Sequence, residues 1–499
     1  MFVTQVTATA IQVGESDCCH LLFPALIGAC PMSVLDGDPP VTAPIRSTRL
    51  VEQRGIDHIP ESERTGTVRQ LGFMWSGVIL NVQVVVYGTL LIVIGLNVWQ
   101  ALAAVAIGTA TWVLAGLASL PGPAAGTTTF TVTRAAFGRN GMRPIAFCNW
   151  LQQIGYEVLD LVILVLAGSA LLDMAGVHAG TPTKVVLLVL FSIAQSLLPS
   201  LGHAAITRVL NMLVIPFAAL FLIMAWLTAD KLDITVGQPA GWTALLGGVA
   251  LAASASGLGW TPNAADFSRY LPSSTPRRRI VAAVTIGGGV PQALLMLLGI
   301  GVALLTEQAS DPISGLPSVY PGWFLGPYLV LVIAQMISLN AIDLYSSGVT
   351  LQAIGVRIGR WQAVVLDGVI CALIGSIVVF SADFNTFVSN FLLFMIVWFA
   401  PWAAIFVIDY FLRRGRYDLD SLGAAGGRYL RPGGLHMPGV MAQAAGMLAA
   451  LCCIDTSIFT GPIAKLLNGA DLSVPAGLLM GGIVYYLTAR RTVPAEATV

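Results

Sequence analysis

Charged residues are scarce in this sequence. Asp, Glu, Lys and Arg together make up 10% of the 499 residues, whereas a soluble globular domain carries about 25%. Apolar residues make up 56% of the chain. A soluble protein of this length does not need so much apolar sequence, so the composition indicates a polytopic membrane protein surrounded by lipid.

Other absences exclude further classes of function. The net charge is zero and no basic tract is present, so nucleic-acid binding has no electrostatic support. The seven cysteines lack disulfide or zinc-site spacing, and the five histidines are far apart in the sequence. The motifs of zinc proteases, serine hydrolases, P-loop NTPases and dinucleotide-binding enzymes are missing. We therefore expect no enzyme, no metal, no cofactor and no obligate protein partner.

Long apolar runs are abundant. A transmembrane helix needs about 20 predominantly apolar residues. Runs of sufficient length lie at about 71–97, 100–121, 144–172, 184–201, 205–228, 242–262, 280–305, 323–350, 362–381, 384–411, 438–457 and 473–489. The sequence thus predicts an all-α polytopic membrane protein with twelve transmembrane helices.

The basic residues predict the orientation of these helices. If the first residue lies in the cytoplasm, only Lys184, Lys231 and Lys465 of the 25 Lys and Arg fall on the outer side. Cytoplasmic loops carry an excess of Lys and Arg, so this arrangement fits the positive-inside rule. We expect a multi-pass protein of the plasma (inner) membrane with both termini in the cytoplasm.

Ionisable residues within the third run point to function, because a charge at the centre of a membrane helix costs about 2.5–3.5 kcal/mol on insertion scales. The stretch QQIGYEVLDLV contains Tyr156, Glu157 and Asp160. Tyr156 and Asp160 are four residues apart and share a helix face, and Glu157 lies close to that face. This face predicts either substrate or proton binding, or a buried structural network with a neighbouring helix.

The eighth run contains a second polar group, in QMISLNAIDLYSSG. Serines alone would be ordinary in helix packing, but Asn340 together with Asp343 and Ser338 favours a site-lining helix. Asp367 and Asp409 lie nearer the ends of their runs, where structural pairing is the simpler interpretation.

The first and sixth runs are interrupted. Asn81 and Gln83 lie in the middle of the first, and Trp260-Thr261-Pro262 breaks the sixth. Each run opens a set of five helices, and broken helices in corresponding positions of two halves are typical of a transporter site. The amide of Gln83 both donates and accepts, which suits the edge of an amide or amidine.

Four motifs now carry a family resemblance. GWTPNAADFSRYLP (259–272) resembles the signature after the sixth span of the nucleobase–cation symporter family, which includes cytosine and purine permeases and allantoin and hydantoin transporters. RGIDHIPESERTG (54–66), GPAAG…TRAAFGRNG (122–141) and NAIDLYSSGVTLQ (340–352) are similar to its other landmarks, in family order.

The resemblance implies a LeuT-like fold of two inverted five-helix repeats with two peripheral helices. It divides the chain into a cytoplasmic tail (1–69), a ten-helix transport core (70–412), a cytoplasmic loop (413–437), two peripheral transmembrane helices (438–490) and a second cytoplasmic tail (491–499).

The resemblance also implies roles for individual residues. Substrate would lie between the first, third, sixth and eighth spans. Gln83 matches a substrate-contacting glutamine and Asp160 a position that hydrogen-bonds the substrate. Tyr156 and Trp260 match aromatic positions that stack on it, and such rings suit the two faces of a flat base. Asn340 and Asp343 fall at the polar positions of the eighth helix.

The implied function is import of a nucleobase, cytosine or a purine, by symport with a cation. Ser338 is followed by Leu339 where a second hydroxyl would help to bind Na⁺, so H⁺ is the expected cation. Glu157 and Asp160 are the candidate carriers, because burial in general raises the pKa of a carboxyl. Alternatives are a sodium-coupled permease for hydantoin, allantoin or a related heterocycle, a channel, and an intramembrane enzyme.

The first 31 residues contain three of the seven cysteines and an apolar piece too short to span a membrane. They lack the basic segment of a signal peptide. We expect translation to start at Met32, so mass spectrometry of the natively expressed protein should find Met32 at its N-terminus. Peptides from residues 1–31 would contradict this expectation.

Overall fold

The computed structural model of the chain describes residues 58–497 apart from 201–202, 233–236, 306–312, 314–315, 317–318, 357, 382, 424–426, 428 and 430. The expected start at Met32 lies outside the described residues. The same holds for Arg46, Arg49, Arg54 and the side chains of Arg208, Arg357, Arg360 and Arg428, which contribute to the orientation argument.

The described part is helical, and its only β-structure is an isolated bridge between Asp455 and Thr460. Its α-helices are α1 (Val68–Ile79), α2 (Val82–Val93), α3 (Val98–Ala110), α4 (Trp112–Ala118), α5 (Pro121–Ala125), α6 (Thr129–Phe137), α7 (Arg139–Met174), α8 (Thr181–Ser200), α9 (His203–Ala229), α10 (Trp242–Ala255), α11 (Gly257–Trp260), α12 (Ala264–Ser268), α13 (Arg277–Ala303), α14 (Gly322–Ile354), α15 (Arg360–Ser381), α16 (Phe384–Leu412), α17 (Leu419–Gly423), α18 (Met437–Cys453), α19 (Pro462–Leu466), α20 (Ser473–Ala489) and α21 (Thr492–Ala497).

Each predicted run coincides with a helix or with a broken series of helices. Among the described residues, eight helical segments are long and apolar enough to cross a membrane, and the bent pair α1–α2 makes a ninth. Three shorter apolar helices, Thr181–Leu197, Met437–Cys453 and Ser473–Ala489, fall in the remaining runs. The all-α polytopic architecture is thus confirmed, and the count of twelve spans is consistent with the structure.

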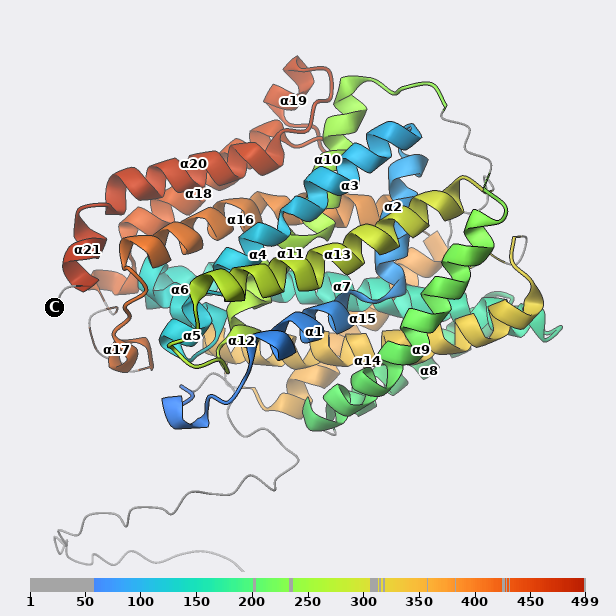
Figure 1. Cartoon of the computed structure of the whole chain (residues 1–499), viewed down its shortest axis with the longest axis horizontal. Helices are drawn as coiled ribbons and strands as arrows, with labels where there is room; N and C mark the ends of the chain where they lie inside the picture. Colours follow the sequence, from blue (N-terminus) through green and yellow to red (C-terminus); the bar gives the residue numbers. More distant parts are fainter. Residues whose placement is uncertain are drawn as a thin grey trace, which may run out of the picture. The chain divides into compact units, whose positions relative to one another are not determined.

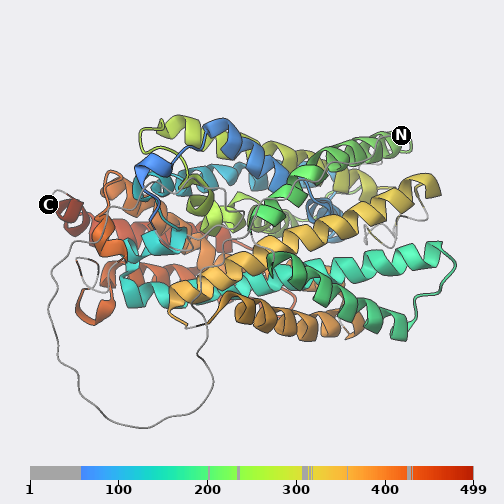
Figure 2. The same cartoon turned by 90° about the horizontal axis from the view of Figure 1, so that it is seen from below.

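Two groups of helices make up the core. In one group α7, α8, α14 and α15 pack against one another, with α7 and α14 in contact along much of their length (Figures 1 and 2). In the other, α13 packs against α1, α2, α3 and α4, and α10 packs on α3. The broken segments α1–α2 and α10–α12 therefore belong to the group that contains α13.

The last long helices lie to one side of this core. α18 and α20 pack on each other and on α16 (Figure 1). At the end of α16, the Asp409 carboxylate accepts hydrogen bonds from Arg413 (2.8 Å) and from the Tyr485 hydroxyl of α20 (2.6 Å). Asp367 of α15 likewise accepts hydrogen bonds from Ser347 and Trp150. Both aspartates therefore have the structural partners that their positions in the sequence predict.

Glycine allows α2 and α13 to touch through their backbones. A Cβ atom on Gly88 would lie 2.1 Å from the carbonyl oxygen of Met296, and one on Gly299 would lie 2.1 Å from that of Val85. Both distances are far below van der Waals contact, so this seam has no room for a side chain. Small residues at such positions let membrane helices approach closely and gain dispersion energy along the contact.

The seam gives a test of the fold. Gly88→Ala forces α2 away from α13, and overpacking of this kind costs about 1–3 kcal/mol. We expect a lower midpoint of thermal unfolding for the detergent-solubilised variant than for the wild type. The control is Gly326→Ala in α14, where an added Cβ meets nothing within 4 Å. The control should be neutral or slightly stabilising, and equal melting of the two variants would contradict the packing described here.

Candidate functional site

The first span is broken between α1 and α2, which meet at a bend of 59°. Asn81 lies at the break and satisfies backbone groups on both sides of it. Its side chain accepts a hydrogen bond from the Val84 amide (3.2 Å) and donates one to the Val78 carbonyl (2.9 Å). The interruption predicted from Asn81 and Gln83 is therefore present.

A second side chain reaches this break from α14. The Gln335 side-chain amide donates a hydrogen bond to the carbonyl oxygen of Leu80, the residue just before Asn81. A helix break inside a bilayer frees carbonyl groups that water cannot reach, so such partners have to come from the protein. The sequence did not lead us to Gln335, although a polar residue within an apolar run could have indicated a partner for the break.

The sixth span is interrupted at the predicted place and also one helical turn before it. The sequence predicts the break at Trp260-Thr261-Pro262, and the chain also leaves helical geometry at Ser256 (φ −103°, ψ −146°), between α10 and α11. Beside this earlier break Gly257 packs directly on another helix, because a Cβ on Gly257 would lie 2.2 Å from the Cα of Trp112. Trp260 ends α11, and a 3₁₀ turn follows over Thr261–Asn263.

Glutamines also satisfy this second break. The Gln292 side chain of α13 donates to the Ala255 carbonyl (2.7 Å) and accepts from the Trp112 indole (2.8 Å). The Gln152 side chain of α7 donates to the carbonyl of Gly259 (3.1 Å). Side chains of α13, α14 and α7 thus bond backbone carbonyls at the two breaks. The sequence did not predict a role for Gln292 or Gln152.

Two aromatic rings face each other beside the second break. Tyr156 of α7 and Trp260 of α11 are nearly parallel, with an interplanar angle of 15° and ring centroids 6.4 Å apart. Phe391 of α16 contacts Tyr156 edge-on at 5.2 Å, and Trp75 of α1 contacts Trp260 edge-on at 5.8 Å. The surrounding rings hold the pair in place from two sides.

A polar group lies next to the aromatic pair. The Gln83 side chain of α2 donates a hydrogen bond to one carboxylate oxygen of Asp160, one turn from Tyr156 on α7. The other carboxylate oxygen of Asp160 is buried and has no donor among the described residues. Asp343 of α14 lies within electrostatic range of Asp160 and of Tyr87. The structure therefore brings Gln83, Tyr156, Asp160, Trp260 and Asp343 together.

Of the remaining predicted site residues, Asn340 and Glu157 meet on another side of α7. The Asn340 side-chain amide donates to the Gln195 side chain of α8 (2.5 Å) and to the backbone carbonyl of Glu157 (3.3 Å). Glu157 is fully buried, and neither of its carboxylate oxygens has a donor among the described residues. The Ser338 hydroxyl donates to the Ala334 carbonyl of its own helix (2.7 Å). Gln195 was missed by the sequence analysis.

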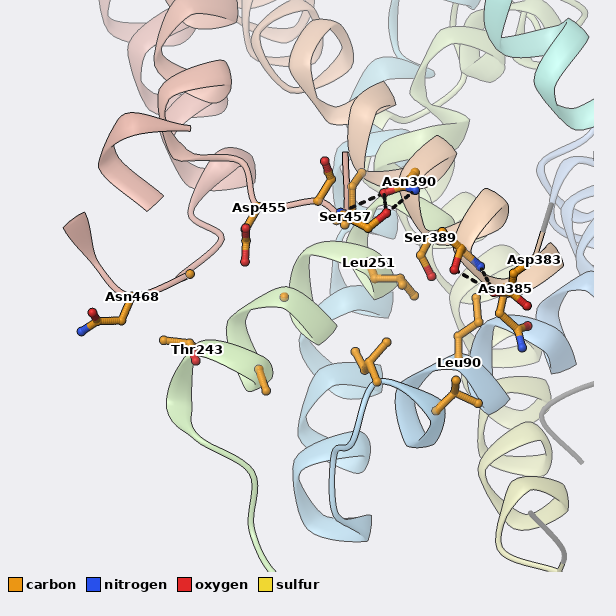
Figure 3. A pocket seen from close by; sticks show the side chains of 18 residues that line it. Leu90, Thr243, Leu251, Asp383, Asn385, Ser389, Asn390, Asp455, Ser457 and Asn468 are labelled. Atoms are coloured by element: carbon orange, nitrogen blue, oxygen red, sulfur yellow. Dashed lines mark hydrogen bonds between the residues drawn. The ribbon is translucent and has the colours of Figure 1, made fainter. Parts of the chain in front are cut away.

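A cavity of about 540 Å³ lies apart from the aromatic pair, and Figure 3 shows the side chains that line it. It is lined by the end of α2, the start of α10, the start of α16 and the loop between α18 and α20. Asn390 and Leu393 of α16 line the cavity, whereas Phe391 packs on Tyr156, so α16 forms the wall between the two. Asn390 also exchanges hydrogen bonds with the Ser457 hydroxyl (2.7 Å) and amide (3.1 Å) of that loop.

Comparisons with known proteins agree on one family. Residues 58–477 match the family model described as permease for cytosine/purines, uracil, thiamine, allantoin. A putative purine-cytosine permease, YxlA of Bacillus subtilis, is 28% identical over 457 residues, which cover 88% of this chain and 95% of that protein. The purine-cytosine permease fcyB of Emericella nidulans is 24% identical over 463 residues, or 87% of each chain.

Solved structures show the same fold. Mhp1, a nucleobase-cation-symport-1 family transporter in a closed conformation with bromovinylhydantoin bound, has a TM-score of 0.69 at 17% identity, covering 90% of this chain and 97% of its own. Its inward-facing conformation gives 0.70 at 16% identity. The resemblance seen in the sequence motifs and the LeuT-like fold that it implies are both confirmed. The chain belongs to the family of permeases for cytosine/purines, uracil, thiamine and allantoin, and is a multi-pass membrane transporter of the nucleobase type rather than an enzyme.

Proposed function

We propose that this protein imports a nucleobase, cytosine or a purine, by symport with H⁺ across the plasma (inner) membrane, with both termini in the cytoplasm. The observation that carries the proposal is the near-parallel pair of rings, Tyr156 and Trp260, beside two helix breaks. The names of the relatives, purine-cytosine permeases of a bacterium and a fungus, support the same substrate class.

A flat heteroaromatic base fits between the two rings with a small adjustment. Carbon atoms in contact are about 3.5 Å apart, so a base sandwiched between parallel rings needs them about 7 Å apart. The centroids of Tyr156 and Trp260 lie 6.4 Å apart. Because the separation of the ring planes cannot exceed the centroid distance, substrate binding requires the rings to move apart by at least about 0.6 Å, or to slide. Stacking of a base on an aromatic ring is worth about 1–3 kcal/mol in single-strand binding proteins, which gives the scale expected here.

The polar edge of the base would meet Gln83 and Asp160. The free carboxylate oxygen of Asp160 is an unmet acceptor, and an exocyclic amine or a ring N–H supplies the missing donor. An analogue without that N–H leaves the buried oxygen unpaired, so the site should reject it strongly. Asp343, which lies near Asp160, is a second candidate for contact with this edge.

Buried carboxyls supply the candidate proton carriers. Glu157 accepts no hydrogen bond from the described residues, and an ionised carboxylate in such surroundings has an uncompensated cost of desolvation. Asp160 and Asp343 lie close enough for their negative charges to repel each other. Protonation relieves both costs. For Na⁺, Ser338 offers a hydroxyl already bonded within its own helix, and Leu339 follows it.

The site is tested by binding measurements on purified protein. A ligand that binds the folded state raises its apparent stability, so a thermal-shift panel of nucleobases, hydantoin and allantoin should select cytosine or a purine. Trp260→Ala removes one stacking ring and should weaken binding about tenfold or more. Asp160→Ala should abolish saturable binding, and Asp343→Asn should change the preferred base or the pH dependence.

The matched control for the tryptophan is Trp226→Ala on α9, where the ring is 66% exposed on the outside of the molecule. It should bind substrate as the wild type does. Wild-type affinity in all three site variants, with Trp226→Ala unchanged, would place the substrate elsewhere. A panel that selects hydantoin or allantoin instead would reject the nucleobase and favour the alternative heterocycle permease.

The coupling ion is tested by uptake of labelled base into proteoliposomes. A proton ionophore should collapse accumulation, and replacement of Na⁺ by choline should have no effect. Glu157→Gln mimics a permanently neutral carboxyl, so it should retain binding but lose pH-driven accumulation. Uptake that follows the Na⁺ gradient and ignores the ionophore would refute proton coupling, and uptake that never saturates would indicate a channel.

A further inference from the structure

An apolar groove runs along the outer surface between α1 and α13, and neither Tyr156 nor Trp260 lines it. We call it the α1–α13 groove. It has a volume of about 670 Å³. Phe73, Ser76, Ile286 and Val290 line its length, and Arg69 and Arg279 lie at the end where both helices begin.

The floor of the groove is backbone. A Cβ on Gly287 would lie 2.4 Å from the carbonyl oxygen of Gly72, so α1 and α13 touch there without side chains between them. The Ser76 hydroxyl spans the same contact by donating to the Gly287 carbonyl (2.8 Å). On either side of this floor, Phe73 and Ile286 stand 64% and 62% exposed. Small residues in the floor and large apolar residues on the walls produce an apolar groove that is open to the surface.

The basic end of the groove carries uncompensated positive charge. Arg69 and Arg279 are both exposed, and within the described part of the chain neither forms an ion pair with a carboxylate. The Arg69 guanidinium lies over the Phe73 ring at 5.4 Å, which draws it toward the groove. A cation–π contact of this kind orients the side chain but leaves its positive charge available to an anion.

We propose that the α1–α13 groove binds one anionic diacyl phospholipid, with its phosphate at Arg69 and Arg279 and an acyl chain along the glycine floor. The lengths agree. From Arg279 to Val290 the helix rises about 17 Å, and one leaflet occupies half of the roughly 30 Å hydrocarbon core. Guanidinium groups pair well with phosphate oxygens, and basic pockets between membrane helices on the cytoplasmic side suit anionic headgroups.

The proposal is independent of the transported substrate. A lipid in this groove contacts α1 at Phe73 and Ser76, on the first half of the broken span. It also contacts α13, which supplies Gln292 to the second break. The bound lipid would therefore stabilise the helix group that carries both breaks.

The test compares lipid retention by purified protein in native mass spectrometry. Phosphatidylglycerol and phosphatidylcholine with identical acyl chains are offered together. The wild type should retain phosphatidylglycerol preferentially. Each arginine near an anionic surface is worth about 1 kcal/mol, so Arg69→Gln or Arg279→Gln should lower phosphatidylglycerol affinity about fivefold and the double variant about thirtyfold.

The control is the double variant Arg490→Gln, Arg491→Gln, which removes two exposed arginines at the end of α20 and should keep the wild-type preference. A second variant, Ile286→Trp, fills the groove without changing charge, and should reduce lipid occupancy with both arginines in place. It tests the proposal even if the arginine variants do not fold.

Three results would overturn the proposal. One is equal retention of the two lipids by the wild type. The second is displacement of phosphatidylglycerol by millimolar inorganic phosphate, which would assign the arginines to a soluble anion. The third is that the wild type forms a dimer and that Ile286→Trp dissociates this dimer without a change in lipid retention. That result would make the groove an interface between two copies of the chain.

Discussion

Every N–H and C=O group that a broken helix frees inside a bilayer needs a partner within the protein. This constraint explains the arrangement around both breaks. At the first break, Asn81 bonds backbone groups of its own span, and Gln335 bonds another from α14. At the second break, Gln292 of α13 and Gln152 of α7 bond backbone carbonyls. The breaks persist because helices distant in the sequence supply these amides, and the breaks in turn bring Trp260 beside Tyr156.

Helix α7 presents different chemistry on different sides. Tyr156 and Asp160 face the broken spans, where the proposed substrate lies. Glu157, the residue after Tyr156, is fully buried, and Asn340 of α14 bonds its backbone carbonyl. In the proposed mechanism the proton and the base would therefore occupy neighbouring positions of one helix. Movement of α14 relative to α7 would affect both, which is the kind of shared element that symport requires.

The sequence predicts the helices well because membrane insertion depends on local properties, namely the length of apolar runs and the distribution of arginine. It also predicts that the first and sixth spans are broken. The sixth span is interrupted where Pro262 predicts it, and a further break at Ser256 lies beside a contact that is not local, that of Gly257 with Trp112. The partners of buried polar groups are equally hidden, since Asn340 pairs with Gln195, 145 residues away. Ring spacings and the orientation of Gln83 toward Asp160 likewise depend on tertiary packing.

The glycine seam between α2 and α13 has a structural consequence. Because Gly88 and Gly299 place backbone against backbone, α2 and α13 lie as close to each other as two helices can. α2 therefore packs directly on the helix whose Gln292 donates to the carbonyl of Ala255 at the second break. The two breaks, although about 175 residues apart along the chain, are thus connected through one helix, because α13 packs on α2 and bonds the backbone at Ala255.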